Sequence, residues 1–423
     1  MPFKAPNPYA RSLSMGTERL AYVLLSAAAA ATACYQALRF FQFHRALASG
    51  LEFLKEGRAA EAERVLSSVP PCRESNARAL PVAAMCRHNL AVALLRQRKY
   101  PEAFSVIDEV VHYYANRSPD NPHMLNALLL LARVLYKLGR YEEIVTPLKR
   151  ARDFTDEHVD ASSRAADIRI KLGVAYMRVG RYNKALEYLL PAAERERQST
   201  SADRTTETQA RFSLGALYLH RGNLVEAESI QEEVLATRLT ESGRGDVKTL
   251  QVITNTAWLR LLQGKYDEAE ALAMEVAAAA QGYEWRANSL HTLAILFTRS
   301  NRFEEAGELF SRVRQERRRE FPDDHPELAK LQCDLATLRM GQGKVDAADD
   351  LLRSAREMLE AKLAGEHPLI GLVLFRTGQL RVKQGRPIEA KPLLESALAI
   401  YERTAPQHPD AVECRRALEA LDI

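Results

Sequence analysis

Histidine and cysteine are the residues of this 423-residue sequence best suited to bind a metal ion. Three of its ten histidines precede prolines, in His325-Pro326, His367-Pro368 and His408-Pro409, at intervals of 42 and 41 residues. On separate helical units, such histidines would lie roughly 10 Å apart for each packed helix layer, too far to share one ion. The sequence therefore predicts no metal site and no cofactor, and it assigns these histidines a structural role.

The five cysteines are scattered along the chain, and none forms the short pair with two intervening residues that is typical of zinc or redox sites. They are Cys34, Cys72, Cys86, Cys333 and Cys414. Neither a disulfide framework nor a zinc site fits this distribution. Reduced and mostly buried thiols are the better interpretation.

Catalytic motifs are also absent from the sequence. The stretch "ESGRGDVKT" from Glu241 contains two glycines but lacks the spacing of a phosphate-binding loop, and it reads better as a turn. No serine-histidine-acid or paired-carboxylate arrangement stands out. We therefore predict that the protein is not an enzyme, and we look instead at the elements that dominate the chain.

A turn signal recurs along almost the whole sequence, as a glycine or its substitute followed by a basic or polar residue and often an apolar one. The nine turn positions are Gly57, Arg98, Gly139, Gly180, Gly222, Gly264, Asn301, Gly343 and Gly385. They are separated by 41, 41, 41, 42, 42, 37, 42 and 42 residues, so one unit is shorter by about a turn of helix. Such a period indicates a repeat architecture.

Small residues keep the same period on both sides of the turn. Seven residues before it stand Gly50, Ala91, Ala132, Gly173, Gly215, Ala257, Ala294, Ala336 and Gly378. Five residues after it stand Ala62, Ala103, Ile144, Ala185, Ala227, Ala269, Ala306, Ala348 and Ala390. Small residues at fixed places let two helices approach closely, and a glycine ends the first helix in a left-handed cap. The pattern predicts an array of helix-turn-helix units.

Spacing and residue types together resemble the tetratricopeptide repeat, in its long kinesin-light-chain-like variety. The His-Pro dipeptides that open the first helices carry this resemblance, and Pro122 occupies the same place seventeen residues before its turn glycine. Proline suits the first helical turn because its missing N–H needs no partner there. The resemblance implies an all-α, right-handed superhelical solenoid of about nine repeats over residues 39–404. Residues 405–423 are expected to form a solvating C-terminal capping helix.

Composition agrees with a soluble solenoid. The side chains comprise 59 basic and 55 acidic residues, a net charge of +4, and 47% of residues are hydrophobic. This balance argues against nucleic-acid binding through bulk charge. It leaves a protein or peptide as the expected partner, with no small-molecule substrate.

The amino-terminal region departs from the repeat. Residues 1–19 form a basic tail, and Leu20 to Leu38 contains no charged residue. Nineteen residues in a helix span about 28 Å, close to the thickness of a bilayer core. Aromatic and basic residues follow it, as at a membrane interface. We therefore predict a single-pass membrane or signal-anchor helix, with the mitochondrion as one candidate location.

Three other interpretations of this region stay open. The alanine-rich stretch could be a helix that packs on the first repeat, or the basic tail could be part of a cleaved organelle-targeting segment. Ala31-Thr32-Ala33-Cys34 also resembles a degenerate lipoprotein cleavage box. A cleaved segment would leave the repeats in the cytoplasm or in an organelle lumen.

The resemblance also implies which residues of the first helices point into a concave groove. They are His88, Asn89, Arg96, Asn126, Arg133, Lys137, Asp167, Lys171, Arg178, Gln209, His220, Asn255, Trp258, His291, Arg299, Lys330, Asp334, Arg376, Gln379 and Lys383. Lysine and arginine outnumber aspartate on this surface, which favours an acidic segment. As the partner-binding set we predict His88, Asn89, Arg133, Lys171, Arg178, Asn255, Trp258, His291, Arg376 and Lys383.

The predicted function is that of a membrane-tethered adaptor that assembles protein complexes through this basic groove. The alternatives are a soluble organelle or cytosolic scaffold with a cleaved targeting segment, and a non-catalytic regulatory subunit of an enzyme complex. A clamp for chaperone tails is disfavoured, because neither unit before Asn89 or Asn255 carries the lysine-asparagine pair that such clamps use.

Overall fold

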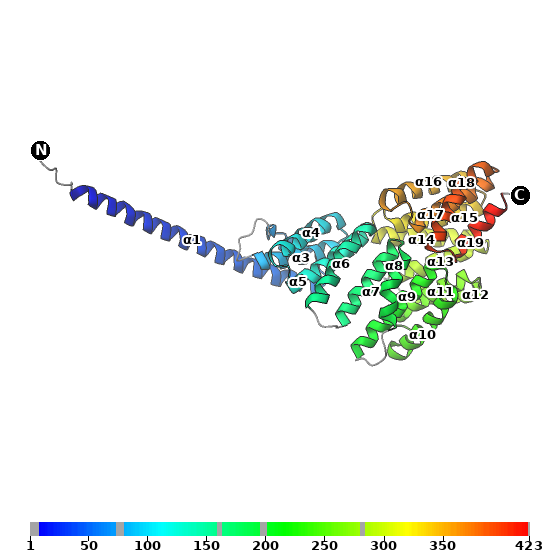
Figure 1. Cartoon of the computed structure of the whole chain (residues 1–423), viewed down its shortest axis with the longest axis horizontal. Helices are drawn as coiled ribbons and strands as arrows, with labels where there is room; N and C mark the ends of the chain where they lie inside the picture. The colour runs from blue at the N-terminus through cyan, green and yellow to red at the C-terminus, as the bar shows by residue number, and fades with distance from the viewer. Residues whose placement is uncertain (1–7, 73–79, 159–162, 195–200, 280–283, 422–423) are drawn as a thin grey trace. The chain divides into compact units, whose positions relative to one another are not determined.

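The computed structural model describes residues 8–72, 80–158, 163–194, 201–279 and 284–421, with the backbone alone for residues 8–27, 80, 158, 163, 201–204 and 284 (Figure 1). These residues fold into two compact units, Met1–Ala127 and Leu128–Ile423, which are described separately. All regular secondary structure in the described ranges is helical, so the predicted all-α class is confirmed.

The first unit contains two helix pairs and the beginning of a third. Its helices are α1 (Pro8–Lys55), α2 (Ala59–Leu66), α3 (Leu80–Arg96) and α4 (Tyr100–Arg117). Each second helix packs on the one before it through an apolar face, as in α4, where Val106, Ile107 and Val110 are buried. The unit boundary falls within the next helix, α5 (Pro122–Lys137).

The second unit continues the alternation of first and second helices in sequence order (Figure 1). It contains α6 (Tyr141–His158), α7 (Ser163–Arg178), α8 (Tyr182–Ala193), α9 (Ser201–Arg221), α10 (Leu224–Ser242), α11 (Val247–Leu262), α12 (Tyr266–Ala279), α13 (Glu284–Arg299), α14 (Phe303–Glu320), α15 (Pro326–Gly341), α16 (Val345–Lys362), α17 (Pro368–Lys383), α18 (Pro387–Thr404) and α19 (Pro409–Glu419). With the helices of the first unit, the described chain holds nine pairs followed by α19. This count agrees with the predicted repeats and capping helix.

The predicted turn positions all adopt the same backbone conformation. Seven are glycines with positive φ, and Arg98 and Asn301 take φ values of 64° and 59° at the two places where the repeat lacks glycine. A left-handed residue ends the first helix of each pair and lets the next helix begin after a short turn. Position in the repeat therefore decides the conformation even where the residue type disfavours it.

The predicted small positions bring the helices of a pair together. A Cβ atom at Gly173 would lie 2.6 Å from Cγ of Leu189, and one at Gly378 would lie 2.6 Å from Cδ2 of Leu394. Both leucines are completely buried, because they fill the space that a side chain on the facing helix would occupy. In the short repeat the described part of the second helix, α12, has 14 residues, whereas α14, α16 and α18 each have 18.

Helix α1 differs from the expected separation of a membrane segment and a first repeat. It runs without interruption through residues 20–38 into the repeat, and its later part, with Phe43 and Leu54 buried, packs on α2 and α3. Tyr35 and Phe41 are exposed, at 55% and 69%. Among the described residues no helix has both the length and the apolar character needed to cross a membrane. The predicted membrane span is not confirmed.

Candidate ligand cavity in the Leu128–Ile423 unit

The His-Pro dipeptides begin the last three first-type helices, α15, α17 and α19. In each, the histidine is the N-cap and proline occupies the first helical turn. The histidine Nδ1 atom accepts a hydrogen bond from the backbone N–H two residues later, at 3.2 Å for His325 and 3.1 Å for His367. Because Nδ1 is the acceptor, the neutral ring carries its proton on Nε2.

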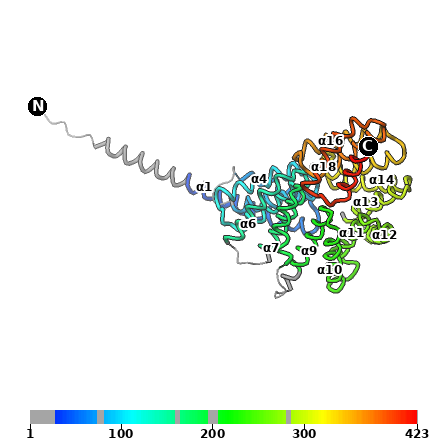
Figure 2. The backbone as a smooth tube through the Cα atoms, turned by 45° about the vertical axis from the view of Figure 1, so that its right-hand side comes forward, coloured from blue at the N-terminus to red at the C-terminus, as the bar shows by residue number. Residues whose placement is uncertain are grey.

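That second nitrogen connects repeats far apart in the sequence. His325 Nε2 donates to the carbonyl of Tyr136 at 2.9 Å, and His367 Nε2 donates to the carbonyl of Arg178 at 2.8 Å. Donor and acceptor are 189 residues apart in both cases. The amino ends of α15 and α17 therefore lie against the carboxyl ends of α5 and α7, and Figure 2 traces this return of the chain within the unit.

The turn glycines make this approach possible. A Cβ atom at Gly139 would lie 2.5 Å from Cδ of Pro326, and one at Gly222 would overlap the backbone of Gln407 and His408. No such neighbour lies within 4 Å of an added Cβ at Gly264 or Gly385. The same glycine thus has a second role only in those repeats that meet the His-Pro ends.

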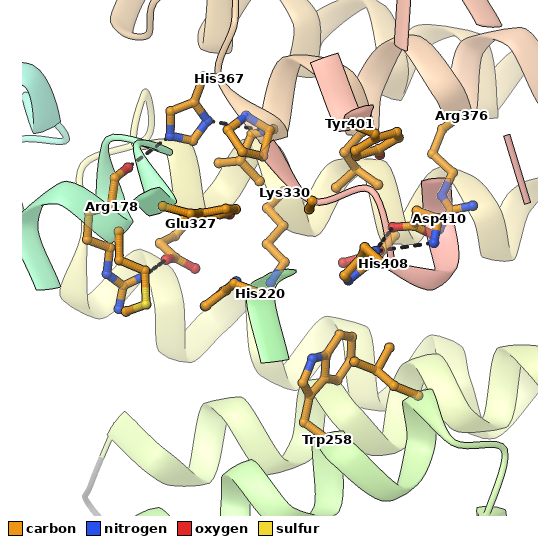
Figure 3. Close-up of a pocket in the computed structure, with 18 of the residues that line it drawn as sticks. Arg178, His220, Trp258, Glu327, Lys330, His367, Arg376, Tyr401, His408 and Asp410 are labelled. Atoms are coloured by element: carbon orange, nitrogen blue, oxygen red, sulfur yellow. Dashed lines mark hydrogen bonds and ion pairs between the residues drawn. The ribbon is translucent and has the colours of Figure 1, made fainter. Parts of the chain in front are cut away.

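A cavity of about 150 Å³ lies behind these contacts (Figure 3). First-type helices supply much of its wall, including Arg178 of α7, Trp258 of α11, Lys330 of α15 and Arg376 of α17. In the described chain its lining includes four arginine or lysine residues (Arg178, Arg299, Lys330 and Arg376) and three carboxylates (Glu327, Asp334 and Asp410). Positive charge is in excess here, although the whole chain is nearly balanced.

On one side of the cavity Glu327 is held between two arginines. Its Oε1 lies 3.0 Å from Nη1 of Arg178, and its Oε2 lies 3.9 Å from Nη2 of Arg317. Burial by itself raises the pKa of the Glu327 carboxyl, but Arg317 and Arg178 outweigh it and hold the pKa well below its usual range. This carboxylate therefore remains ionised and already has its partners.

On the other side Arg376 pairs with Asp410. Nη2 of Arg376 lies 2.9 Å from Oδ1 of Asp410, and both residues are buried. Burial raises and Arg376 lowers the pKa of Asp410, with a net shift below its usual value. Arg376, which belongs to the predicted partner-binding set, is therefore buried, and a carboxylate from the next first-type helix neutralises it.

Lys330 extends between these two pairs, towards Trp258 and His220 (Figure 3). Glu327, Lys330 and Asp334 are three and four residues apart, so they share one face of α15. Glu327 is paired with arginine, and Oδ2 of Asp334 lies 3.0 Å from Nε2 of His291. Within the described residues Lys330 has no carboxylate within ion-pair distance, and its Nζ lies 5.7 Å from the centre of the Trp258 ring.

His220 also borders the cavity. Its side chain is exposed to this open space, but the helices packed around the cavity and the charges of Lys330 and Arg178 still lower the pKa of His220 below its usual value. The imidazole is therefore neutral at pH 7. It supplies no charge to compensate or compete with Lys330.

Two tyrosines that line the cavity carry buried hydroxyls without hydrogen-bond partners in the described structure. They are Tyr141 and Tyr401, which are 2% and 4% exposed. An unpaired buried hydroxyl costs about 1–3 kcal/mol. Together with Lys330, these groups suit a ligand that brings oxygen acceptors, while Trp258 offers it an apolar surface.

Only three members of the predicted partner-binding set line this cavity: Arg178, Trp258 and Arg376. Lys171 pairs with Asp167 in a separate cavity between α7, α9 and α11, and Lys383 donates to the carbonyl of Met340. His291 is buried beside Asp334. Arg133 and Asn255 do not line the cavity, and His88 and Asn89 belong to the first unit.

Several lining residues were not in that set. Lys330, Arg299 and His220 are on the concave surface that the family resemblance implies, so their position could be predicted but not their convergence. Glu327 and Asp410 each stand two residues after a His-Pro histidine, a signal that could have placed them at helix starts. Nothing in the sequence pattern indicated Tyr141 or Tyr401, which come from second-type helices.

Comparison with known families agrees with this architecture. The tetratricopeptide repeat model matches residues 82–157, 164–240, 207–282, 285–361 and 327–403. These matches cover well over half of the chain, so the protein belongs to the tetratricopeptide repeat family. No curated protein sequence matches it.

Solved structures resemble this chain at low sequence identity, and the first two named here share its fold. The Rap conjugation gene regulator of plasmid pLS20, in complex with the Phr* peptide, is 15% identical with a TM-score of 0.56 over 92% of this chain and 98% of its own. NprR in complex with its cognate peptide NprX is 14% identical, with a TM-score of 0.53 over 66% and 79%. Kinesin-light-chain repeats of Podosopora anserina are 19% identical, with a TM-score of 0.42 over 47% and 96%.

Proposed function

We propose that this protein is a non-catalytic interaction scaffold that binds a peptide segment of a protein partner, with one side chain of that segment entering the cavity of the Leu128–Ile423 unit. The observation that carries the proposal is the convergence on one cavity of Lys330, Trp258 and two tyrosines whose buried hydroxyls are unpaired. A cavity lined by charged and aromatic groups that still have unused hydrogen-bonding or ion-pairing capacity is suited to binding a ligand. The lining offers no arrangement that favours a particular reaction.

The structural neighbours support a peptide as the ligand. Rap is seen with a Phr* peptide and NprR with NprX, and both share the helical repeat fold of this chain. The cavity volume of about 150 Å³ is below the roughly 300–1,000 Å³ of common small-molecule pockets. We therefore place only one side chain inside and the remainder of the segment along the first-type helices.

A selection from a random twelve-residue peptide library on the full-length protein tests this proposal. Peptides that bind should lose at least about tenfold in affinity on Trp258→Ala, because aromatic anchors commonly dominate such interfaces. Met274→Ala is the control, since Met274 is 55% exposed on α12 and does not line the cavity. Circular dichroism establishes that both variants stay helical. Peptides that bind both variants as well as the wild type would place the binding surface elsewhere.

Recruitment of this scaffold to a membrane by Leu20–Leu38 stays a prediction from the sequence. It expects the full-length chain to remain with membranes after an alkaline carbonate wash. Release of the protein into the wash would contradict it.

A further inference from the structure

We infer that the cavity binds a carboxylate carried on a compact apolar group, with Lys330 as its cationic partner. The inference rests on the proposed function, in which the carboxylate belongs to the bound peptide segment. It goes further by naming the chemistry that the cavity selects.

The first argument is the balance of charges around the cavity. Arg178 and Arg317 face Glu327, and Arg376 faces Asp410 at 2.9 Å. Asp334 is beside His291. Lys330 has no carboxylate within ion-pair distance among the described residues, although it is near enough to Glu327 to help lower the pKa of that carboxyl. Arg299 is a second cation on the lining, so positive charge stays in excess over the carboxylates in a partly enclosed space where water screens it less than at an open surface. A ligand carboxylate would complete the pairing.

The second argument is independent of charge. Tyr141 and Tyr401 line the same cavity, and their hydroxyl oxygens, which have almost no accessible surface, donate to no acceptor in the described structure. A carboxylate can accept several hydrogen bonds at once, so one such group can satisfy an ammonium and a hydroxyl together. A neutral apolar ligand would leave all these donors unpaired.

The third argument concerns size and the apolar part of the ligand. A cavity of about 150 Å³ holds a group close to benzene in size. Trp258, Leu262, Ile295 and Leu372 contribute apolar surface to the lining. A carboxylate with one small aromatic or aliphatic body therefore fits, whereas a long flexible acid would not be enclosed.

Phenylacetate and its neutral isostere phenylacetamide are the probes that test this assignment on the full-length protein. Saturation-transfer NMR and calorimetry should show phenylacetate binding at least about tenfold more tightly than phenylacetamide. Lys330→Met should abolish this preference and Lys330→Arg should retain most of it. Lys344→Met is the matched control, because Lys344 is exposed at the start of α16, outside the cavity, and should leave the preference unchanged.

Tyr401→Phe provides a second measurement that does not depend on removing a charge. Removal of a partnerless buried hydroxyl should leave the melting temperature unchanged or raise it, whereas the affinity for phenylacetate should fall several-fold. A purely structural role of Tyr401 would give no loss of affinity. Equal binding of the acid and the amide, a preference that survives Lys330→Met, or tighter binding of phenyl phosphate than of phenylacetate would each overturn the inference.

Peptides selected as described above separate this inference from the proposed function. Their acidic residues are replaced by the corresponding amides, and their carboxyl ends are amidated, so that a side-chain carboxylate is distinguished from a terminal one. Coupling of about tenfold between one of these changes and Lys330→Met supports the inference. Peptides that need Trp258 but show no such coupling would overturn the inference and leave the proposed function standing. If phenylacetate is preferred through Lys330 but no selected peptide depends on Trp258, the carboxylate site would be supported and the proposed peptide scaffold would be refuted.

Discussion

The contact between Gly222 and the start of α19 allows a sharp test of how the second unit closes. Gly222 and Gly264 occupy the same turn position in successive repeats, with φ values of 82° and 76°. Alanine at either position would be held in the left-handed backbone conformation, which lowers the free energy of unfolding by roughly 1–2 kcal/mol. Only at Gly222 would the new Cβ also overlap the backbone of Gln407 and His408.

The additional cost at Gly222 follows from what lies beside it. Carbon atoms pack at about 3.5–4.0 Å, so the start of α19 must move away by more than about 1 Å. Backbone atoms cannot escape by changing a rotamer, and overpacking of this kind costs typically about 1–3 kcal/mol. We therefore expect Gly222→Ala to destabilise the unit by about 1–3 kcal/mol more than Gly264→Ala does.

Urea denaturation combined with hydrogen exchange measures this difference. Because repeats can unfold locally, exchange at the amides of α19 is the more direct measurement. These amides should lose protection in Gly222→Ala and keep it in Gly264→Ala. Equal destabilisation and equal protection of α19 in the two variants would refute the contact, and with it the closure of the cavity by the His-Pro ends.

Two further predictions concern buried ionisable groups. Burial lowers the pKa of His367 to about 4 from an ordinary 6.5. Below pH 6.5 the unfolded chain binds a proton at this histidine before the folded chain does, so the free energy of unfolding should fall by about 3 kcal/mol between pH 6.5 and 4. His367→Asn keeps an N-cap acceptor without titrating, and melting curves between pH 7 and 4 should therefore show a weaker pH dependence than the wild type; parallel curves would contradict this role. Arg376→Met leaves Asp410 buried without its partner and should cost about 3–5 kcal/mol in urea denaturation at pH 7, whereas the double variant with Asp410→Asn should recover part of that loss. A double variant as unstable as the sum of its single variants would indicate no coupling between the two side chains.

The sequence by itself predicted the repeat with high precision, because each unit depends on local signals. Arg98 and Asn301 show this best, since their place in the period predicted a turn that the residue type alone would not. Leu189 and Leu394 fill the spaces opposite Gly173 and Gly378 for the same reason. A helix pair is specified by its own residues and its immediate neighbour, and periodicity reports those interactions directly.

Only the tertiary structure decided which repeats meet across 189 residues. The small rotation between successive repeats accumulates over several units, and no local pattern encodes its sum. That sum places Glu327 against Arg178, 149 residues before it in the chain. Between neighbouring repeats Asp410 neutralises Arg376, a predicted groove cation, and Lys330 has no carboxylate within ion-pair distance in the described structure. The sequence could list the residues of a concave surface, but their pairing depends on distances between helices that are adjacent only in the folded superhelix.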